Sequence, residues 1–191
     1  MFHNRIAMNK THFIFLFVSL LLFSCKKENE HQPRKTTGKI NTISVIIDDQ
    51  FWNGEIGDSI RNKFASPVIG LPQEEPLFNI NQYPVRLLEG FMTDTRAIIV
   101  VKNAEENKFE IKKNQYASPQ NVFHISGKTA ADIIACIEKN TPKMIETIKN
   151  CELAESQKIN SQSLIDPKVI ENKFHLSIQV PSGYAYVLQK S

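Results

Sequence analysis

The sequence predicts an α+β fold in which a mixed or antiparallel β-sheet carries helices packed mainly on one face. Two short apolar runs rich in β-branched residues, Ile43–Ile47 and Ala97–Val101, are typical of central strands covered on both faces. A third segment, Phe174–Val180, alternates apolar and polar residues as a half-buried strand does. Helical patterns lie between these strands, so the expected element order is β-α-β-β-β-α-α-β.

The first helix is expected at Glu55–Ala65, directly after the first strand. Ile56, Ile60 and Phe64 recur at every fourth position and therefore form one apolar stripe. Asn53 stands where an N-cap residue is needed. These features predict an amphipathic helix that packs against the sheet.

A long connection rich in proline, Pro67–Pro84, follows this helix. Its length indicates either a functional loop or irregular structure wrapped around the domain. Two further short strands are expected at Lys108–Lys112 and Val122–Ile125, where apolar residues alternate or cluster.

Two helices are expected between the strand at 122–125 and the one at 174–180. Thr129 and Asp132 have the spacing of a capping box, so the first helix should begin there. Pro142 suits the first turn of a second helix, because a proline at that position loses no hydrogen bond. The apolar positions are Ala130, Ile133, Ile134 and Ile137 in the first helix, and Met144, Ile145, Ile148 and Cys151 in the second.

The N-terminal segment 1–24 has the three parts of a secretion signal. Arg5 and Lys10 supply positive charge, and no acidic residue precedes Glu28. The apolar run Phe13–Phe23 is too short for a permanent membrane span, which needs about 20 residues, but it has the length of a signal core. Met8 would also begin a complete signal, so either methionine can be the start.

A lipobox ends this signal, at Leu22-Phe23-Ser24-Cys25. Cleavage is expected between Ser24 and Cys25, and lipidation on the thiol of Cys25. Stable anchoring needs two or more acyl chains, at about 0.8 kcal/mol for each buried methylene. We therefore expect the mature chain to be held at a membrane through lipidated Cys25.

The run from Lys26 to Lys39 has no apolar residue except Pro33, so a solvated tether is expected. Lys26 is not the aspartate typical of inner-membrane retention, and the acidic run after it resembles lipoprotein export signals of Bacteroidetes. The expected location is the cell envelope, as an outer-membrane lipoprotein facing the periplasm or the cell surface. The predicted organisation is signal peptide (1–24), lipidated cysteine and tether (25–39), and one α/β domain (40–191).

Composition argues against nucleic acid as a partner. Without Arg5 and Lys10, the 23 basic residues fall to 21, against 20 acidic residues, so the mature chain is nearly neutral. Cys136 and Cys151 fit no zinc or redox spacing. They could pair in an oxidising envelope, but buried free thiols are the favoured interpretation.

The segment Gly127-Lys128-Thr129 has the appearance of the end of a phosphate-binding loop. The complete motif needs a glycine at the position of Val122, so an ordinary helix start is the better interpretation. No other catalytic, cofactor-binding or metal-binding motif is present.

Several separated blocks occur in order along the chain. They are the strand before Asp48, Trp52 with Gly54, Gly57 and Asp58, the loop from Gly70 through Gln73 and Glu75 to Phe78, Arg96, and Pro119-Gln120. With these blocks, roughly residues 38–185 resemble an uncharacterised family of Bacteroidetes lipoproteins, a domain of unknown function. That family carries no assigned activity, so the resemblance implies no catalytic residue. Members of the family look longer than this chain, so the resemblance implies a truncated form.

The sequence therefore predicts a lipid-anchored envelope lipoprotein whose domain binds or scaffolds an envelope protein or glycan. No catalytic residue, cofactor or metal is assigned. The candidate recognition surface is the turn at Trp52 and the loop residues Gly70, Gln73, Glu75 and Phe78.

An alternative function is a metal-dependent or carboxylate-based hydrolase. Its acidic residues would be Asp48 and Asp49 at a strand end, together with Glu74 and Glu75 in the loop. Clustered carboxylates can bind a hard cation or transfer protons.

Overall fold

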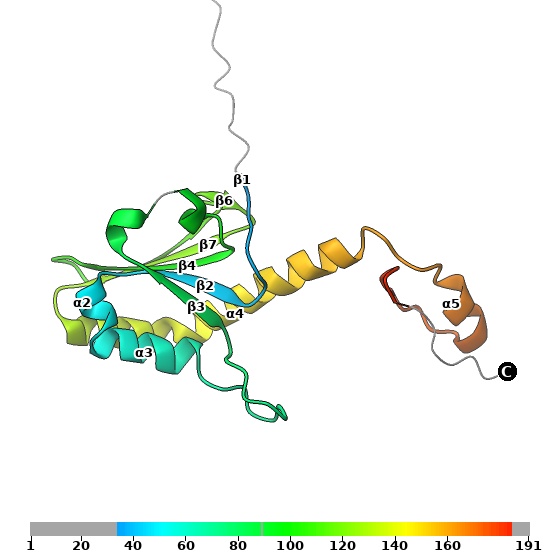
Figure 1. Cartoon of the computed structure of the whole chain (residues 1–191), viewed down its shortest axis with the longest axis horizontal. Coiled ribbons are helices and arrows are strands. Elements are labelled where there is room, and N and C mark those ends of the chain that lie inside the picture. Colours follow the sequence, from blue (N-terminus) through cyan, green and yellow to red (C-terminus); the bar gives the residue numbers. More distant parts are fainter. Residues whose placement is uncertain (1–33, 89, 185–191) are drawn as a thin grey trace, which may run out of the picture. The chain divides into compact units, whose positions relative to one another are not determined.

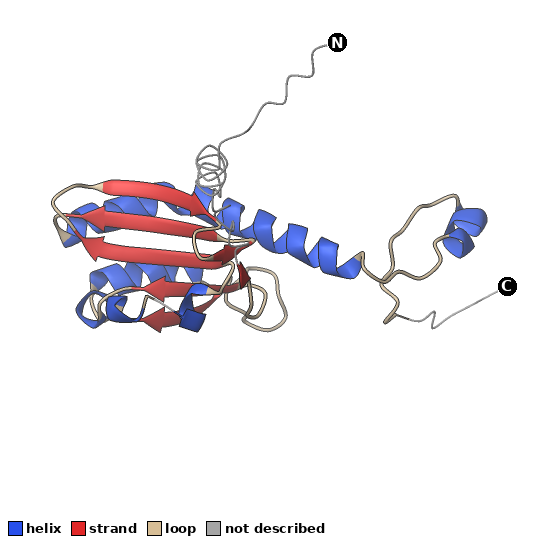
Figure 2. Ribbon diagram, turned by 90° about the horizontal axis from the view of Figure 1, so that it is seen from above, coloured by secondary structure: helices blue, strands red, loops and turns tan. Residues whose placement is uncertain are grey.

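A five-stranded sheet forms the centre of the computed structural model, which describes residues 34–88 and 90–184. The strand order is β3-β2-β4-β7-β5 (Figure 2). All neighbours are parallel except β5, which pairs antiparallel with β7. The predicted α+β fold with a mixed sheet is confirmed. The strands are β2 (Thr42–Ile46), β3 (Asn79–Tyr83), β4 (Ala97–Asn103), β5 (Lys108–Lys113) and β7 (Asn121–Gly127).

Two helices, α3 (Glu55–Phe64) and α4 (Ala130–Asn160), lie on the same side of this sheet (Figure 1). Alternate residues of β2, β4 and β7 point towards them and form the main core. The other face carries a smaller cluster made by Ile46, Ile98, Val100 and Val122. It is covered by residues in and around η1 (Val85–Leu87), so the central strands are buried on both faces, as their apolar sequences predict.

The turn after β2 contains a short helix, α2 (Asp49–Trp52), which the sequence does not predict. Asn53 therefore closes α2, and Gly54 occupies the N-cap position of α3. This corrects the prediction that Asn53 caps α3. The predicted apolar stripe of α3 is confirmed, because Ile56, Ile60 and Phe64 are all buried.

The segment 130–160 is one helix, α4, and the prediction of two helices divided at Pro142 is wrong. Pro142 lacks the N–H that a helix interior requires, but the residues before it add side-chain hydrogen bonds. Asn140 Nδ2 donates to the carbonyl of Cys136 at 2.8 Å, and Thr141 Oγ1 donates to that of Ile137 at 2.7 Å. The predicted capping box of Thr129 is confirmed by reciprocal hydrogen bonds with Asp132.

The prediction of a strand at Phe174–Val180 is also wrong. Phe174 ends a short helix, α5 (Lys168–Phe174), and the residues after it form no regular element. The alternating side chains stay exposed, at 58% for Phe174, 56% for Leu176 and 47% for Ile178. Alternation makes a strand only where a sheet edge accepts it, and none does so within the described ranges.

Two strand pairings are not predicted by the sequence. One is near the start of the described chain, and the other is in the proline-rich connection. Arg34–Lys35 (β1) pairs in parallel with Ala117–Ser118 (β6), and Thr36 is buried beside them. The described part of the predicted tether is thus bound to the domain. The connection Pro67–Pro84, expected to be a functional loop or irregular structure, contains the edge strand β3.

The predicted signal sequence, Cys25 and most of the predicted tether lie outside the described residues, as do residues 185–191. None of the helices in 34–88 and 90–184 is both long and apolar enough to cross a bilayer.

Candidate functional site

The predicted recognition residue Trp52 lies at the end of α2, half-buried against the core. The guanidinium of Arg61 stacks on its ring, 4.5 Å from the ring centre, and Arg61 Nη1 donates to the Trp52 carbonyl at 3.0 Å. Arg61 also pairs with Asp58 at 2.7 Å. One face of the indole is therefore occupied by a contact within the chain, which ties α2 to α3.

The predicted recognition loop forms a small exposed hairpin between α3 and β3. Val68 N donates to the Glu75 carbonyl at 2.9 Å, and Gly70 has a positive φ of 94° at the tip. Gln73 and Glu75 are exposed, whereas Phe78 is fully buried in the core. The surface that this loop offers to a partner consequently excludes Phe78.

The Trp52 turn and this loop lie at opposite ends of α3. The loop leads into β3 beside Thr42, at the amino end of β2, while Trp52 follows the carboxyl end of β2. The ten residues of α3 separate them by about 15 Å at 1.5 Å per residue. They do not form one cleft.

The same separation applies to the acidic residues of the alternative hydrolase. Asp48 and Asp49 lie at the carboxyl end of β2, where Asp49 Oδ1 accepts from Gln82 Nε2 at 3.1 Å. Glu74 and Glu75 lie in the loop at the other end. Within residues 34–88 and 90–184, no three His, Cys, Asp or Glu side chains are placed to share a metal ion.

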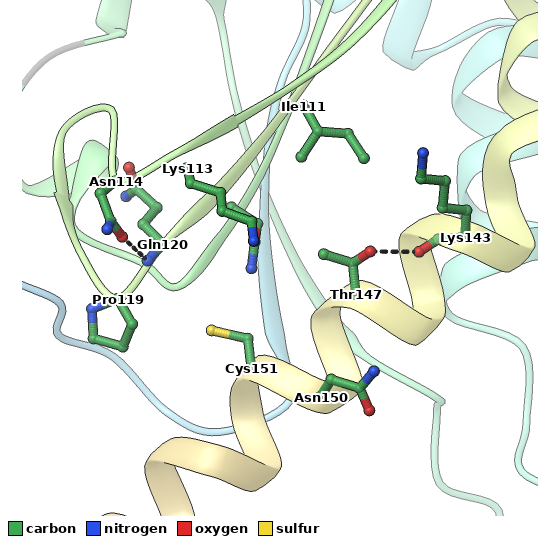
Figure 3. Close-up of a pocket in the computed structure, with 10 residues that line it drawn as sticks. Ile111, Lys113, Asn114, Pro119, Gln120, Lys143, Thr147, Asn150 and Cys151 are labelled. Carbon is green, nitrogen blue, oxygen red and sulfur yellow. Dashed lines mark hydrogen bonds between the residues drawn. The ribbon is translucent and has the colours of Figure 1, made fainter.

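A groove with a volume of about 760 Å³ lies between the end of β5 and the middle of α4 (Figure 3). Its walls come from β5, from the loop between β6 and β7, from the start of β7, and from one side of α4. A volume of this size suits a small organic ligand. No motif in the sequence predicts this groove.

The sheet wall follows from strand register. Lys113 on β5 is paired with Asn121 on β7, two residues along each strand from the pair Ile111 and Phe123. Phe123 belongs to the core beneath α4, and side chains two residues apart on a strand share a face. Lys113 and Asn121 therefore both face the helix layer.

Asn121 is the most unusual residue of the groove. It is only 6% exposed, and its side-chain amide makes no hydrogen bond with any residue of the described chain. Its amide atoms are not fully enclosed by protein, and the residue lines the groove. A molecule bound in the groove could therefore take both the donor and the acceptor of this amide.

The loop wall is held rigid by Gln120, which is 2% exposed. Its Nε2 donates to the carbonyls of Thr93 at 2.6 Å and Thr95 at 2.8 Å, and its Oε1 accepts from Tyr116 N at 3.0 Å. Its backbone N–H donates to Asn114 Oδ1 at 2.9 Å (Figure 3). Every polar group of the Gln120 side chain is thus used to position the loop, and Asn114 stays fixed beside the groove.

The helix wall presents Lys143, Thr147, Asn150 and Cys151, which share one side of α4 at helical spacing. Thr147 Oγ1 donates to the Lys143 carbonyl at 2.7 Å, so its lone pairs remain available as acceptors. Lys113 from the sheet and Cys151 from the helix extend into the same space (Figure 3).

The groove is basic. Lys113 and Lys143 both line it, neither forms an ion pair with a residue of the described chain, and no acidic residue lines it. The nearby carboxylate of Glu152 is paired with Arg96 at 2.9 Å. An anion entering the groove would therefore meet two uncompensated positive charges.

The chemistry of Cys151 argues against a nucleophilic role. Burial raises the pKa of its thiol, and the charge of Glu152 raises it further, although Arg96 and Lys113 act in the opposite direction. The thiol therefore stays protonated near neutral pH, and no histidine lines the groove to act as a base. Cys151 and Cys136 are both free and stand 15 residues apart on α4, as the prediction of free thiols requires.

Several residues of the predicted family pattern have structural roles instead of facing the groove. A Cβ on Gly57 would lie 1.9 Å from the Trp52 carbonyl oxygen, so only glycine fits there. Arg96 binds Glu152, and Gln120 positions the loop. Sequence patterns do not reveal the groove residues Lys113, Asn121 and Lys143. These residues come from three separate elements, so no short motif contains them.

Comparison with known proteins identifies a family. No curated protein and no solved structure matches the chain. A family model covers residues 36–161, from the end of β1 to the C-cap of α4, and so includes the sheet, α3, α4 and the whole groove. The chain therefore belongs to the family described as Domain of unknown function (DUF8532).

Proposed function

We propose that this chain is a lipid-anchored envelope lipoprotein whose domain binds a ligand in the groove between β5 and α4 and performs no chemistry on it. The observation that carries the binding function is Asn121, a largely buried residue that lines a groove of ligand size and whose amide makes no hydrogen bond with the described chain. The lipobox at Leu22–Cys25 supports the anchor. The likeness to Bacteroidetes lipoproteins supports an outer-membrane location.

A binding function fits the groove better than catalysis does. Catalysis needs an activated nucleophile or an acid–base pair within reach of a substrate. The groove holds a protonated thiol, lysines and amides, which can bind and orient a ligand but do not form such a pair. The carboxylates of the alternative hydrolase lie at opposite ends of α3.

Native mass spectrometry of the full chain, extracted from membranes in mild detergent, tests both the lipid anchor and ligand binding in the groove. The expected species begins at Cys25, carries acyl chains, and retains a small-molecule adduct that is lost in Asn121→Leu. An unmodified N-terminus would contradict the anchor. An adduct that persists in Asn121→Leu would contradict the groove as the binding site.

A second candidate function, contact with an envelope protein, is favoured by the exposed hairpin between α3 and β3. Ile69 at its tip is fully exposed, and Val68 and Leu71 beside it are exposed at 36% and 46%. Clustered exposed apolar side chains are typical of contact surfaces. A photo-crosslinker at Gln73 should capture one partner in membranes, and Ile69→Ser should abolish that capture. Capture unchanged by Ile69→Ser would exclude the loop tip.

A further inference from the structure

We infer that the ligand of the groove is an acidic sugar, a carbohydrate that carries a carboxylate or a phosphate. This inference rests on the proposed function and adds the chemical class of the ligand. It follows from three properties of the groove: its charge, its hydrogen-bonding groups and its shape.

The charge comes from Lys113 on the sheet and Lys143 on α4. Both lysines line the groove, and neither forms an ion pair with an acidic residue of the described chain. A lysine is a compact point charge with three donors, which suits a carboxylate or phosphate without requiring a fixed planar geometry. The groove therefore selects an anion.

The hydrogen-bonding groups select hydroxyl groups on the same ligand. The amide of Asn121 offers both a donor and an acceptor, and neither is used within the described chain. Thr147 Oγ1 offers acceptor lone pairs because its own proton is donated to the Lys143 carbonyl. A bare anion would need only lysines and a backbone amide. The groove also offers the Asn121 side-chain amide and the acceptor oxygen of Thr147, which suit the hydroxyl groups of a sugar ring.

The remaining walls fit the carbon faces of a sugar. Ile111 and Pro119 supply apolar surface on the sheet and loop sides, and the volume of about 760 Å³ exceeds what an isolated phosphate fills. The loop that carries Pro119 is fixed by Gln120, so the site is already formed in the free chain. A preformed site loses less entropy on binding.

Isothermal titration calorimetry on the full chain in detergent tests this inference with four probes: glucuronate, glucose 6-phosphate, glucose and inorganic phosphate. We expect glucuronate or glucose 6-phosphate, or both, to bind in a salt-sensitive manner, because exposed charges are screened. Glucose and inorganic phosphate should bind at least about tenfold more weakly, since each lacks one of the two kinds of contact. Equal binding of glucose, equal binding of phosphate, or no binding of either acidic sugar would overturn the inference.

Variants identify the site. Lys113→Gln and Lys143→Gln should each weaken binding about tenfold, as expected for the loss of a charged hydrogen bond. Lys149→Gln removes an exposed charge from a different side of α4 and should leave binding unchanged. If all three variants bind alike, the groove is not the site.

Asn121→Leu separates a binding role from a structural role. Because the Asn121 amide has no partner in the described chain, this variant should unfold at the same temperature as the original chain or at a higher one, while binding is lost. A lower unfolding temperature with binding retained would overturn the assignment. A native-mass adduct without affinity for acidic sugars would refute only the ligand class, and the proposed function would stand.

Discussion

Arg96 and Glu152 form an ion pair in which both side chains are more than nine-tenths buried, with Arg96 Nε donating to Glu152 Oε2 at 2.9 Å. Arg96 stands immediately before β4, and Glu152 lies in α4 beyond Pro142. The pair therefore joins the second half of the long helix to the sheet. The pair also neutralises the negative charge of the Glu152 carboxylate beside the basic groove.

Removing one partner of this pair should be costly. Glu152→Ala leaves a buried guanidinium uncompensated, and we expect it to lower the free energy of unfolding by about 3–5 kcal/mol. Arg34→Ala is the matched control, since Arg34 pairs with Asp94 at 3.2 Å but is 58% exposed, and it should cost less than about 1 kcal/mol. Urea denaturation measures both. Equal losses would show that the buried pair does not hold α4.

Gly57→Ala should destabilise the chain although alanine is normally the better helix former. The added Cβ would meet the Trp52 carbonyl oxygen at 1.9 Å, so α2 must move away from α3. Overpacking of this kind costs about 1–3 kcal/mol. Gly183→Ala, where a Cβ meets no atom within 4 Å, should be nearly neutral. Thermal unfolding of the two variants checks this; a Gly57→Ala protein as stable as the original would contradict the close approach.

His124 should make stability fall as the pH drops from about 7, just above the ordinary imidazole pKa of about 6.5, to about 5. Burial lowers the pKa of its imidazole below 6.5, with Lys112 adding to the effect. The unfolded chain then binds a proton more readily than the folded chain, so the contribution of His124 is present above the unfolded pKa and is lost as the pH falls. Urea midpoints measured across this range should fall more for the original chain than for His124→Gln. Parallel curves would exclude the effect.

Cys25→Ser should release the chain from membranes. In the proposed anchor a thioether on Cys25 would hold the diacylglyceryl group, and serine cannot form that bond. Membrane fractionation should find the variant in the soluble fraction, while Cys136→Ser, which alters a half-buried thiol on α4, should remain with membranes. A Cys25→Ser chain that stays membrane-bound would show that another segment supplies the anchor.

Most of the fold could be predicted because its signals are local. Buried strands such as Ala97–Asn103 read as apolar runs, and the stripe on α3 has helical spacing. The errors arose where a local signal competed with tertiary contacts. Pro142 indicates a helix start, yet the buried positions of α4 continue at helical spacing across it. Those positions are Ile133, Ile137, Thr141, Met144, Ile148, Glu152 and Glu155.

The candidate site was much less predictable than the fold. Lys113, Asn121 and Lys143 meet only because β5 pairs with β7 in a particular register and α4 crosses their ends. No spacing in the sequence encodes that meeting. Conversely, the sequence predicts that Trp52 is available to a partner, but Arg61 covers one face of its ring. That contact depends on the turn between α2 and α3.

The central claim, that the groove holds a ligand, is tested most directly by the rate at which maleimide labels Cys151. Cys136 is an internal control, because it lies on the same helix outside the groove and burial raises the pKa of both thiols. In native membranes, compared with extensively dialysed protein, we predict that Cys151 reacts several-fold more slowly and Cys136 at an unchanged rate. Equal Cys151 rates in the two preparations would contradict the account.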